Sequence, residues 1–385
     1  MTRTVPVWVY AEVNPATPEF KTLDDGTEVS FMPLETIWPG GKADYTNTLL
    51  WSSKQSYSQF RRGDILVPKI TPTFEAGRTI IAEIPISLGL ASTEVHVVRA
   101  NGSSNPRFLQ YCFQSLPFLD EGAHSLQGVG NLRRITPRFV QEYEAPNVTL
   151  DVQCAIADYL DRETGEIDAM IATMDELAET LVIRRLEMIK HAFVDGSTVS
   201  GPTPVFALAT SEDNRRIPVK AEERAAMSGE YPYYGASGVI DHLDQFIWDN
   251  ETRVLVSEDG ANLLARNHPI AFSASGRYWV NNHAHVLRPN LSVDHRLICY
   301  AFSITDVQHA ITGSAQPKLT AEAMWRLKIP FPLDHRCSKE LADHLDKITG
   351  RIDAMLGKVA ELRSLLVERR AALITDVVTG RKKVA

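Results

Sequence analysis

The chain has 385 residues, of which 44% are hydrophobic and 23% are charged, and its formal net charge is −8. This composition is too apolar for a disordered protein, and the length is enough for two or three domains. No run of about 18 apolar residues and no apolar secretory core occur, so we expect neither a membrane span nor export, and the acidic balance argues against nucleic acid as a partner.

Residues 1–150 are predicted to form a first globular domain that mixes strands and helices. Apolar runs at residues 65–67 and 95–98 are typical of strands, and residues 106–116 are predicted to form a helix with proline in its first turn. The segment carries 13 basic and 15 acidic residues, so it is close to neutral.

Residues 151–196 are predicted to form a long helix that separates two globular domains. This segment holds 4 basic and 11 acidic residues, so most of the acidic excess of the chain lies here. Its apolar residues recur in alternating steps of three and four, which is the pattern of a coiled-coil seam.

Residues 197–336 are predicted to form a second globular domain, again with 13 basic and 15 acidic residues. We expect strands at residues 253–256 and 280–287 and a helix at residues 296–305. Two aromatic-rich stretches, residues 231–238 and 276–283, allow two interpretations. They expose Tyr, Arg and Asn side chains to bases and phosphates, or they are buried turns stabilised by backbone hydrogen bonds.

Residues 337–385 are predicted to form a second long helix, which repeats the first. Residues 156–189 and 341–374 share 17 identities in 34 ungapped positions at an offset of 185. A weaker repeat at an offset of 189 aligns residues 94–113 with 283–302 and matches Arg107 with Arg296 and Tyr111 with Tyr300. The chain is therefore two copies of one unit of about 190 residues.

The two helices are expected to pack on each other, because neither can bury its apolar stripe alone. This predicts an antiparallel two-helix coiled coil and two globular domains related by a pseudo-two-fold axis, in the α+β class because no βαβ rhythm occurs. The matched arginine pairs, residues 184–185 and 369–370, are expected to be solvated. The predicted seam consists of Ile167, Met170, Met174, Leu177, Leu181 and Met188 with Ile352, Met355, Val359, Leu362, Leu366 and Leu373.

Common catalytic signatures are absent from the sequence. The sequence holds no phosphate-binding Gly-rich loop, no Gly-x-Ser-x-Gly elbow and no His-Glu-x-x-His. Its four cysteines are scattered, as in a reduced cytoplasmic protein without a zinc site, and His283 and His285 have no further ligand nearby. We therefore expect a binding protein without a cofactor or metal.

The sequence resembles the specificity subunits of type I restriction-modification systems over nearly its whole length. The two repeats that begin Ile-Ala-Asp-Tyr-Leu-Asp at residue 156 and Leu-Ala-Asp-His-Leu-Asp at residue 341 are similar to the two helical regions of that family. The segments that resemble its target recognition domains are residues 63–78 and 92–99 in the first domain, and 231–241, 257–264, 278–289 and 315–320 in the second.

This resemblance implies a DNA reader that is not itself an enzyme. Each recognition domain, residues 1–150 and 197–336, would read one half of a bipartite target in double-stranded DNA. The spacer helices, residues 151–196 and 337–385, would set the unread gap and bind two methyltransferase subunits, and motor-nuclease restriction subunits would join them. S-adenosylmethionine would be bound by the methyltransferase partner.

The candidate DNA-contacting residues are polar or aromatic side chains of the segments that carry the resemblance. They are Lys69, Thr71, Thr73 and Arg78 in the first domain, and Tyr233, Tyr234, Ser237, Asn262, Arg277, Asn281 and Asn282 in the second. Two other functions remain open: a two-headed protein-binding scaffold, suggested by the acidic charge, and an orphan subunit that no longer reads DNA.

Overall fold

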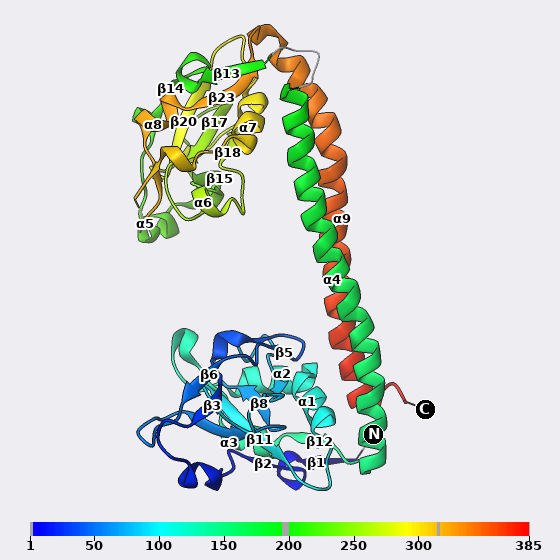
Figure 1. Ribbon diagram of the computed structural model, residues 1–385. Helices are drawn as coiled ribbons and strands as arrows, with labels where there is room; N and C mark the ends of the chain where they lie inside the picture. The colour runs from blue at the N-terminus through cyan, green and yellow to red at the C-terminus, as the bar shows by residue number, and fades with distance from the viewer. Residues whose placement is uncertain (1–2, 195–199, 314–315, 385) are drawn as a thin grey trace. The chain divides into compact units, whose positions relative to one another are not determined.

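The structure, a computed structural model, describes residues 3–194, 200–313 and 316–384 (Figure 1). The chain divides into two compact units. Unit 1 consists of residues 1–175 and 361–385, and unit 2 consists of residues 176–360. Each unit combines an α+β domain with part of each of two long helices, α4 (Leu150–Val194) and α9 (Ser338–Val378). The predicted α+β class is therefore confirmed.

The two domains are built on the same four-stranded antiparallel sheet. In unit 1 the order is β2 (Ala11–Val13), β11 (Val95–Ala100), β8 (Ile65–Pro68), β9 (Ile80–Ile81). In unit 2 the order is β14 (Ala209–Ser211), β20 (Ala284–Pro289), β17 (Arg253–Ser257), β18 (Ala271–Ala274). The strands expected from residues 65–67 and 253–256 occupy the same place in both sheets, as a duplication requires.

The remaining strands differ between the units, apart from one antiparallel pair in each, which joins the strand before the four-stranded sheet to the strand before the long helix. Unit 1 adds a sheet of β6 (Thr48–Leu50), β3 (Glu28–Met32), β10 (Leu88–Ala91) and β7 (Ser58–Arg61), with the pairs β1 (Thr4–Pro6)–β12 (Glu144–Pro146) and β4 (Ile37–Trp38)–β5 (Lys42–Ala43). Unit 2 adds β16 (Gly238–Leu243), β15 (Ser228–Gly235) and β19 (Trp279–Val280), with the pairs β13 (Ser200–Pro204)–β23 (Lys328–Pro332) and β21 (Ile311–Thr312)–β22 (Lys318–Leu319). The strand expected at residues 280–287 is in fact interrupted, because residues 281–283 turn between β19 and β20.

The short helices pack on these sheets. They are α1 (Pro106–Gln114), α2 (Leu116–Ser125) and α3 (Pro137–Glu142) in unit 1, and α5 (Ala221–Ala226), α6 (Asn262–Ala265), α7 (His295–Ile304) and α8 (Ala321–Arg326) in unit 2. Asn105 caps α1 by accepting from the amide of Arg107, and Asp294 caps α7 by accepting from the amide of Arg296. Among the described residues, no helix is long and apolar enough to cross a membrane.

Helices α4 and α9 lie side by side and antiparallel within each unit (Figure 1). In unit 1, Asp168 pairs with Arg370 at 3.0 Å and Asp175 with Arg363 at 2.6 Å. In unit 2, Arg185 pairs with Asp353 at 2.7 Å. Residue numbers thus fall along α9 as they rise along α4. Asp168 and Asp353 are equivalent in the repeat, as are Arg185 and Arg370, so the two units contain the same interhelical ion pair.

The predicted seam holds at every second position. Ile167, Leu181, Ile352 and Val359 are buried, but Met170, Leu177, Met355 and Leu362 are 38–51% exposed. At the alternate positions Ile171, Ala178 and Leu356 face inward instead, one residue further along the helix. In α4 apolar residues fill both neighbouring positions at Leu177 and Ala178, but in α9 the equivalent of Ala178 is Arg363, so the sequence pattern leaves both phases open only in α4. Arg185 and Arg370 take the remaining inner positions, which corrects the expectation that both are solvated.

A stacked aromatic pair fills the core beneath the second sheet of unit 2. Trp248 and Tyr278 are fully buried, and their rings are 4° from parallel with centroids 5.5 Å apart. The Nε1 of Trp248 donates to Glu212 at 2.9 Å, and Arg253 donates to the same carboxylate through two nitrogens, each at 2.9 Å. Arg215 lies over the Trp248 ring at 4.8 Å and pairs with Glu212.

The stability of unit 2 is expected to fall in acid because of this carboxylate. Burial alone would raise the pKa of Glu212, but hydrogen bonds from Arg253 and Trp248 and the two arginine charges lower it to about 2. The stability that ionised Glu212 gives to the folded state is therefore fully present above pH 4.5, and it is lost as the pH falls toward 2. Urea midpoints measured from pH 7 to pH 3 should show a decrease that Glu212→Gln makes smaller. An equal decrease in the variant would contradict this assignment.

Candidate nucleic-acid interface

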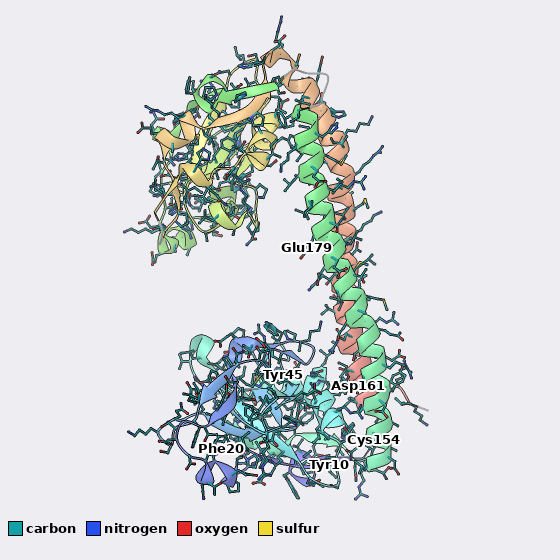
Figure 2. All side chains as sticks on the ribbon, viewed as in Figure 1. Tyr10, Phe20, Tyr45, Cys154, Asp161 and Glu179 are labelled. Carbon is teal, nitrogen blue, oxygen red and sulfur yellow. The ribbon has the colours of Figure 1, made fainter. Side chains whose placement is uncertain are left out.

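A polar clamp fixes the first domain to its helix. Arg107 on α1 pairs with Asp158 at 2.8 Å and also with Asp161, both on α4. The hydroxyl of Tyr111 donates to Asp161 at 2.7 Å and lies 3.2 Å from the hydroxyl of Thr164. Burial raises the pKa of Tyr111, so its hydroxyl stays a donor. Figure 2 labels Asp161 on α4, on the side where α1 lies.

The second domain is held by the same clamp. Arg296 on α7 pairs with Asp343 at 2.7 Å and also with Asp346, both on α9. The hydroxyl of Tyr300 donates to Asp346 at 2.7 Å and lies 3.1 Å from that of Thr349. Every partner stands at the position that the repeat predicts, so the duplication read from the sequence is confirmed contact by contact. The same set of contacts therefore attaches each domain to its long helix.

A polar cleft of about 700 Å³ opens on the domain of unit 1. Its lining includes Tyr57, Gln59, Lys69 and Arg134, side chains that can donate to phosphate or base oxygens. Arg134 donates to Glu94 through Nε and Nη2, at 2.8 and 2.9 Å, and to the carbonyl of Leu132 through Nη1 at 2.8 Å, whereas Lys69 is half-buried in the lining of the same cleft. Lys69 was predicted from the sequence, and no motif marks the other three.

His96 lines this cleft without adding charge to it. Burial lowers its pKa to about 4, so the ring is neutral near pH 7. Its Nε2 lies 3.1 Å from the carbonyl of Ile135, and its Nδ1 lies 3.2 Å from the amide nitrogen of Asn14. One nitrogen therefore donates and the other accepts, as a neutral imidazole requires. The cleft owes its positive charge to Lys69 and Arg134.

The other candidates of the first domain lie outside the cleft lining. Thr71 is buried, with its hydroxyl 3.4 Å from the carbonyl of Arg133, and Thr73 is half-buried. Arg78 donates to the carbonyl of Ile37 at 3.3 Å, so its guanidinium is directed at its own domain. The structure therefore places Lys69 where a ligand can reach it and gives Thr71 and Arg78 partners inside the domain.

Two candidates of the second domain are core residues. Tyr233 is 1% exposed, and its hydroxyl accepts from the amide of Val219 at 3.0 Å. Asn281 is 4% exposed, and its side-chain oxygen accepts from the amide of His283 at 2.8 Å. Side chains alternate between faces along β15, so Tyr233 points into the core while its neighbour Tyr234 is only half-buried. For Tyr233 and Asn281, the interpretation as buried turn residues fits the structure.

The remaining candidates lie nearer the surface of unit 2. Ser237 and Asn282 are exposed. Arg277 is exposed but pairs with Asp249 at 2.8 Å. Asn262 exchanges two hydrogen bonds with the backbone of His268, at 3.0 and 2.8 Å, and so shapes the loop that follows α6. Their contacts with DNA stay a prediction, strongest for Ser237 and Asn282.

Two hydroxyl deletions test the distinction between buried candidates, which stabilise the fold, and exposed candidates, which are available to DNA. Tyr233→Phe is expected to lower the free energy of unfolding by about 1 kcal/mol, because the amide of Val219 loses a buried acceptor, and to leave DNA affinity unchanged. Ser237→Ala is expected to leave stability within about 0.5 kcal/mol and to weaken DNA binding of the assembled complex several-fold. Denaturant unfolding and DNA titrations measure the two effects. The opposite pattern would show that Tyr233 serves binding and Ser237 the fold.

Residues 206–363, which comprise most of unit 2, match the family model of the type I restriction modification DNA specificity domain. This part of the chain is similar to such specificity domains. The resemblance seen in the sequence is thereby confirmed, and the clamp of unit 1 repeats the one inside the specificity domain.

Two curated relatives match parts of the chain. A protein of Haemophilus influenzae named as a type I restriction enzyme specificity subunit is 32% identical over 139 residues, which are 36% of this chain and 34% of the relative. The EcoAI specificity subunit of Escherichia coli is 28% identical over 187 residues, 44% of this chain and 31% of the relative. The chain thus spans about a third of the length of the curated relatives it matches.

A solved chain shares the fold. It comes from a structural study of complex assembly and conformational transition of the type I R-M system. The TM-score is 0.71 at 14% identity, covering 98% of this chain and 97% of that chain. The likeness supports the architecture of two domains and two long helices.

Proposed function

We propose that the chain is the DNA sequence-recognition subunit of a type I restriction-modification complex and has no catalytic activity of its own. Each domain reads one half of a bipartite DNA target, and the helix pair sets the gap between the halves. The observation that carries this proposal is the repeated clamp, which holds a second domain in the manner of the matched DNA specificity domain.

The proposed partners supply the chemistry. Two methyltransferase subunits, one for each copy of the repeat, bind to the helices and domains, and motor-nuclease restriction subunits join them in the cytoplasm. S-adenosylmethionine, bound by the methyltransferase, is the donor for adenine methylation. The recognition subunit itself binds the DNA target and positions the partner subunits on it.

The acidic charge of the chain is compatible with DNA binding by the domains, because most of it lies on a spacer helix. Residues 151–196 carry 11 acidic and 4 basic residues, whereas each domain is nearly neutral. A spacer helix need not touch phosphates, and the domains can use local patches such as the one around Lys69. We therefore expect weak DNA binding by the isolated chain and strong, salt-dependent binding by the complex.

The test is reconstitution with a methyltransferase subunit of a type I system. Methylated positions mapped on genomic DNA should define one split motif, with two specified halves and an unspecified gap. Replacing residues 206–330 with the same segment of another specificity subunit should change only one half of that motif. Methylation without a split motif, or no methylation, would contradict the proposal, and DNA affinity independent of salt would favour a protein-binding scaffold.

A further inference from the structure

A groove of about 650 Å³ separates the domain of unit 2 from its helices. Val182 and Leu186 of α4 and Leu356 of α9 form one wall, and Phe272 of β18 forms the other. Arg185 also lines the groove, and Val182 is 46% exposed there. The groove is thus largely apolar, with an arginine at its helical wall.

The duplication identifies the equivalent place in unit 1. Arg185 and Tyr300 of the groove correspond to Arg370 and Tyr111 by the two repeat offsets. Arg370 is less accessible than Arg185, with 13% of its side chain exposed against 27%. A segment of unit 1 therefore covers Arg370, and unit 2 has no equivalent segment over Arg185 among its described residues.

The cover in unit 1 is the turn between β4 and β5. Arg370 donates through Nη2 to the carbonyl of Gly40 at 3.1 Å while its Nε holds Asp168. Gly41 packs so closely that a Cβ atom there would lie 2.8 Å from the side-chain nitrogen of Gln110. A tight glycine turn is therefore what this place accepts, with its backbone oxygen bound to the arginine.

The same place in unit 2 is open for two reasons. Gln110 and Gln114, which line the covered place, correspond to the smaller Cys299 and Ser303 of the groove. Within residues 176–360, leaving out 195–199 and 314–315, the hydrogen bonds of Arg185 go only to Asp353. The donor and the space for a turn are present, but no turn of the described chain fills them.

The groove is suited to polypeptide and not to nucleic acid. Its walls are largely apolar, and its charged lining consists of Arg185, Arg266, Arg296, Asp346 and Asp353, of which Arg266 donates to the backbone carbonyls of Ser303 and Thr305. These carboxylates would repel a phosphate and already neutralise Arg185 and Arg296. A neutral backbone carbonyl, in contrast, can accept from Arg185 without displacing Asp353, as Gly40 does beside Asp168.

We propose that the groove is the binding site for a tight turn of a methyltransferase subunit, whose backbone carbonyl accepts from Arg185. This rests on the proposed function, which places one such subunit on each copy of the repeat. The partner inserts its turn in unit 2 alone, because the 39–41 turn already occupies the site in unit 1. The two copies of one partner are therefore held differently.

The experiment uses the full chain and the methyltransferase subunit with which it reconstitutes. Hydrogen exchange of the loop at residues 266–270, which lines the groove, should slow when the complex forms. Arg185→Ala should weaken association about ten-fold, as loss of a charge-assisted hydrogen bond requires. Arg370→Ala, the matched control, removes the equivalent ion pair but should leave association unchanged and speed exchange at residues 37–43.

A second variant closes the groove without touching the arginine. Ser303→Trp places a large side chain in the groove and should also weaken association. A complex that forms without slower exchange at residues 266–270, or equal effects of the two arginine variants, overturns the groove proposal and leaves the proposed function intact. Self-association of the chain through the groove also overturns it, and no binding of any methyltransferase overturns both.

Discussion

Replacing Trp248 with alanine is expected to destabilise unit 2 by about 4 kcal/mol. The variant removes a fully buried indole that stacks on Tyr278, and it leaves Glu212 without one of its hydrogen-bond donors. The cavity accounts for most of this cost, because Arg253 and Arg215 still donate to Glu212 in the variant. The expected result is fast hydrogen exchange throughout β17 and β20, the central strands of the unit 2 sheet.

Trp8→Ala is the matched control for this variant. Trp8 is 63% exposed in unit 1, so its removal opens no cavity and should change stability by less than about 0.5 kcal/mol. Exchange in β8 and β11 should then be as slow as in the unmodified chain. If Trp248→Ala left β17 and β20 equally protected, the stacked pair would not be the centre of the unit 2 core.

The aromatic residues of this core show where sequence reasoning was insufficient. The stretch at residues 276–283 allowed exposed contacts or buried turns, and the structure buries Tyr278 and Trp279 while leaving Arg277 exposed. Tyr278 is buried because it stacks on Trp248, which lies 30 residues away in the chain and belongs to no recognisable motif. Local composition cannot reveal a ring that stacks from a distant part of the chain, so the candidate site was predicted only in part.

The duplication, in contrast, could be predicted in detail. Arg107, Tyr111 and Asp161 recur as Arg296, Tyr300 and Asp346, and the structure joins both sets by the same contacts. Both units use the same contact between domain and helix, so both need the same residues, and these residues appear as a repeat in the sequence. The phase of the helix seam could not be predicted in this way, because both phases are apolar around Ala178 in α4, and Arg363 at the equivalent position of α9 favours the phase that the structure does not adopt.

Lengthening the helix pair by whole heptads is expected to change the gap in the DNA target. Seven residues add about 10.5 Å of helix, the length of about three base pairs. The insertions belong after Glu176 in α4 and after Ala360 in α9, because both points lie between the interhelical ion pairs of unit 1 and that of unit 2. A whole heptad keeps the seam in phase, so all three ion pairs can form again.

The number of inserted heptads tests the helix pair as a ruler. One heptad in each helix also rotates the second half-site by about a third of a DNA turn, which should weaken binding. Three heptads in each helix add about 31 Å, close to one full turn of DNA, and should restore binding to a target whose gap is longer by about nine base pairs. Methylated motifs of the reconstituted complex measure the gap.

A heptad inserted in α4 alone is the informative control. It cannot keep Asp168 opposite Arg370 and Arg185 opposite Asp353 at the same time, because α9 has not grown. We expect it to lose sequence-specific methylation altogether. An unchanged gap after the paired insertions would mean that the spacing is set by the methyltransferase subunits, and α4 and α9 would then serve only to attach the two domains.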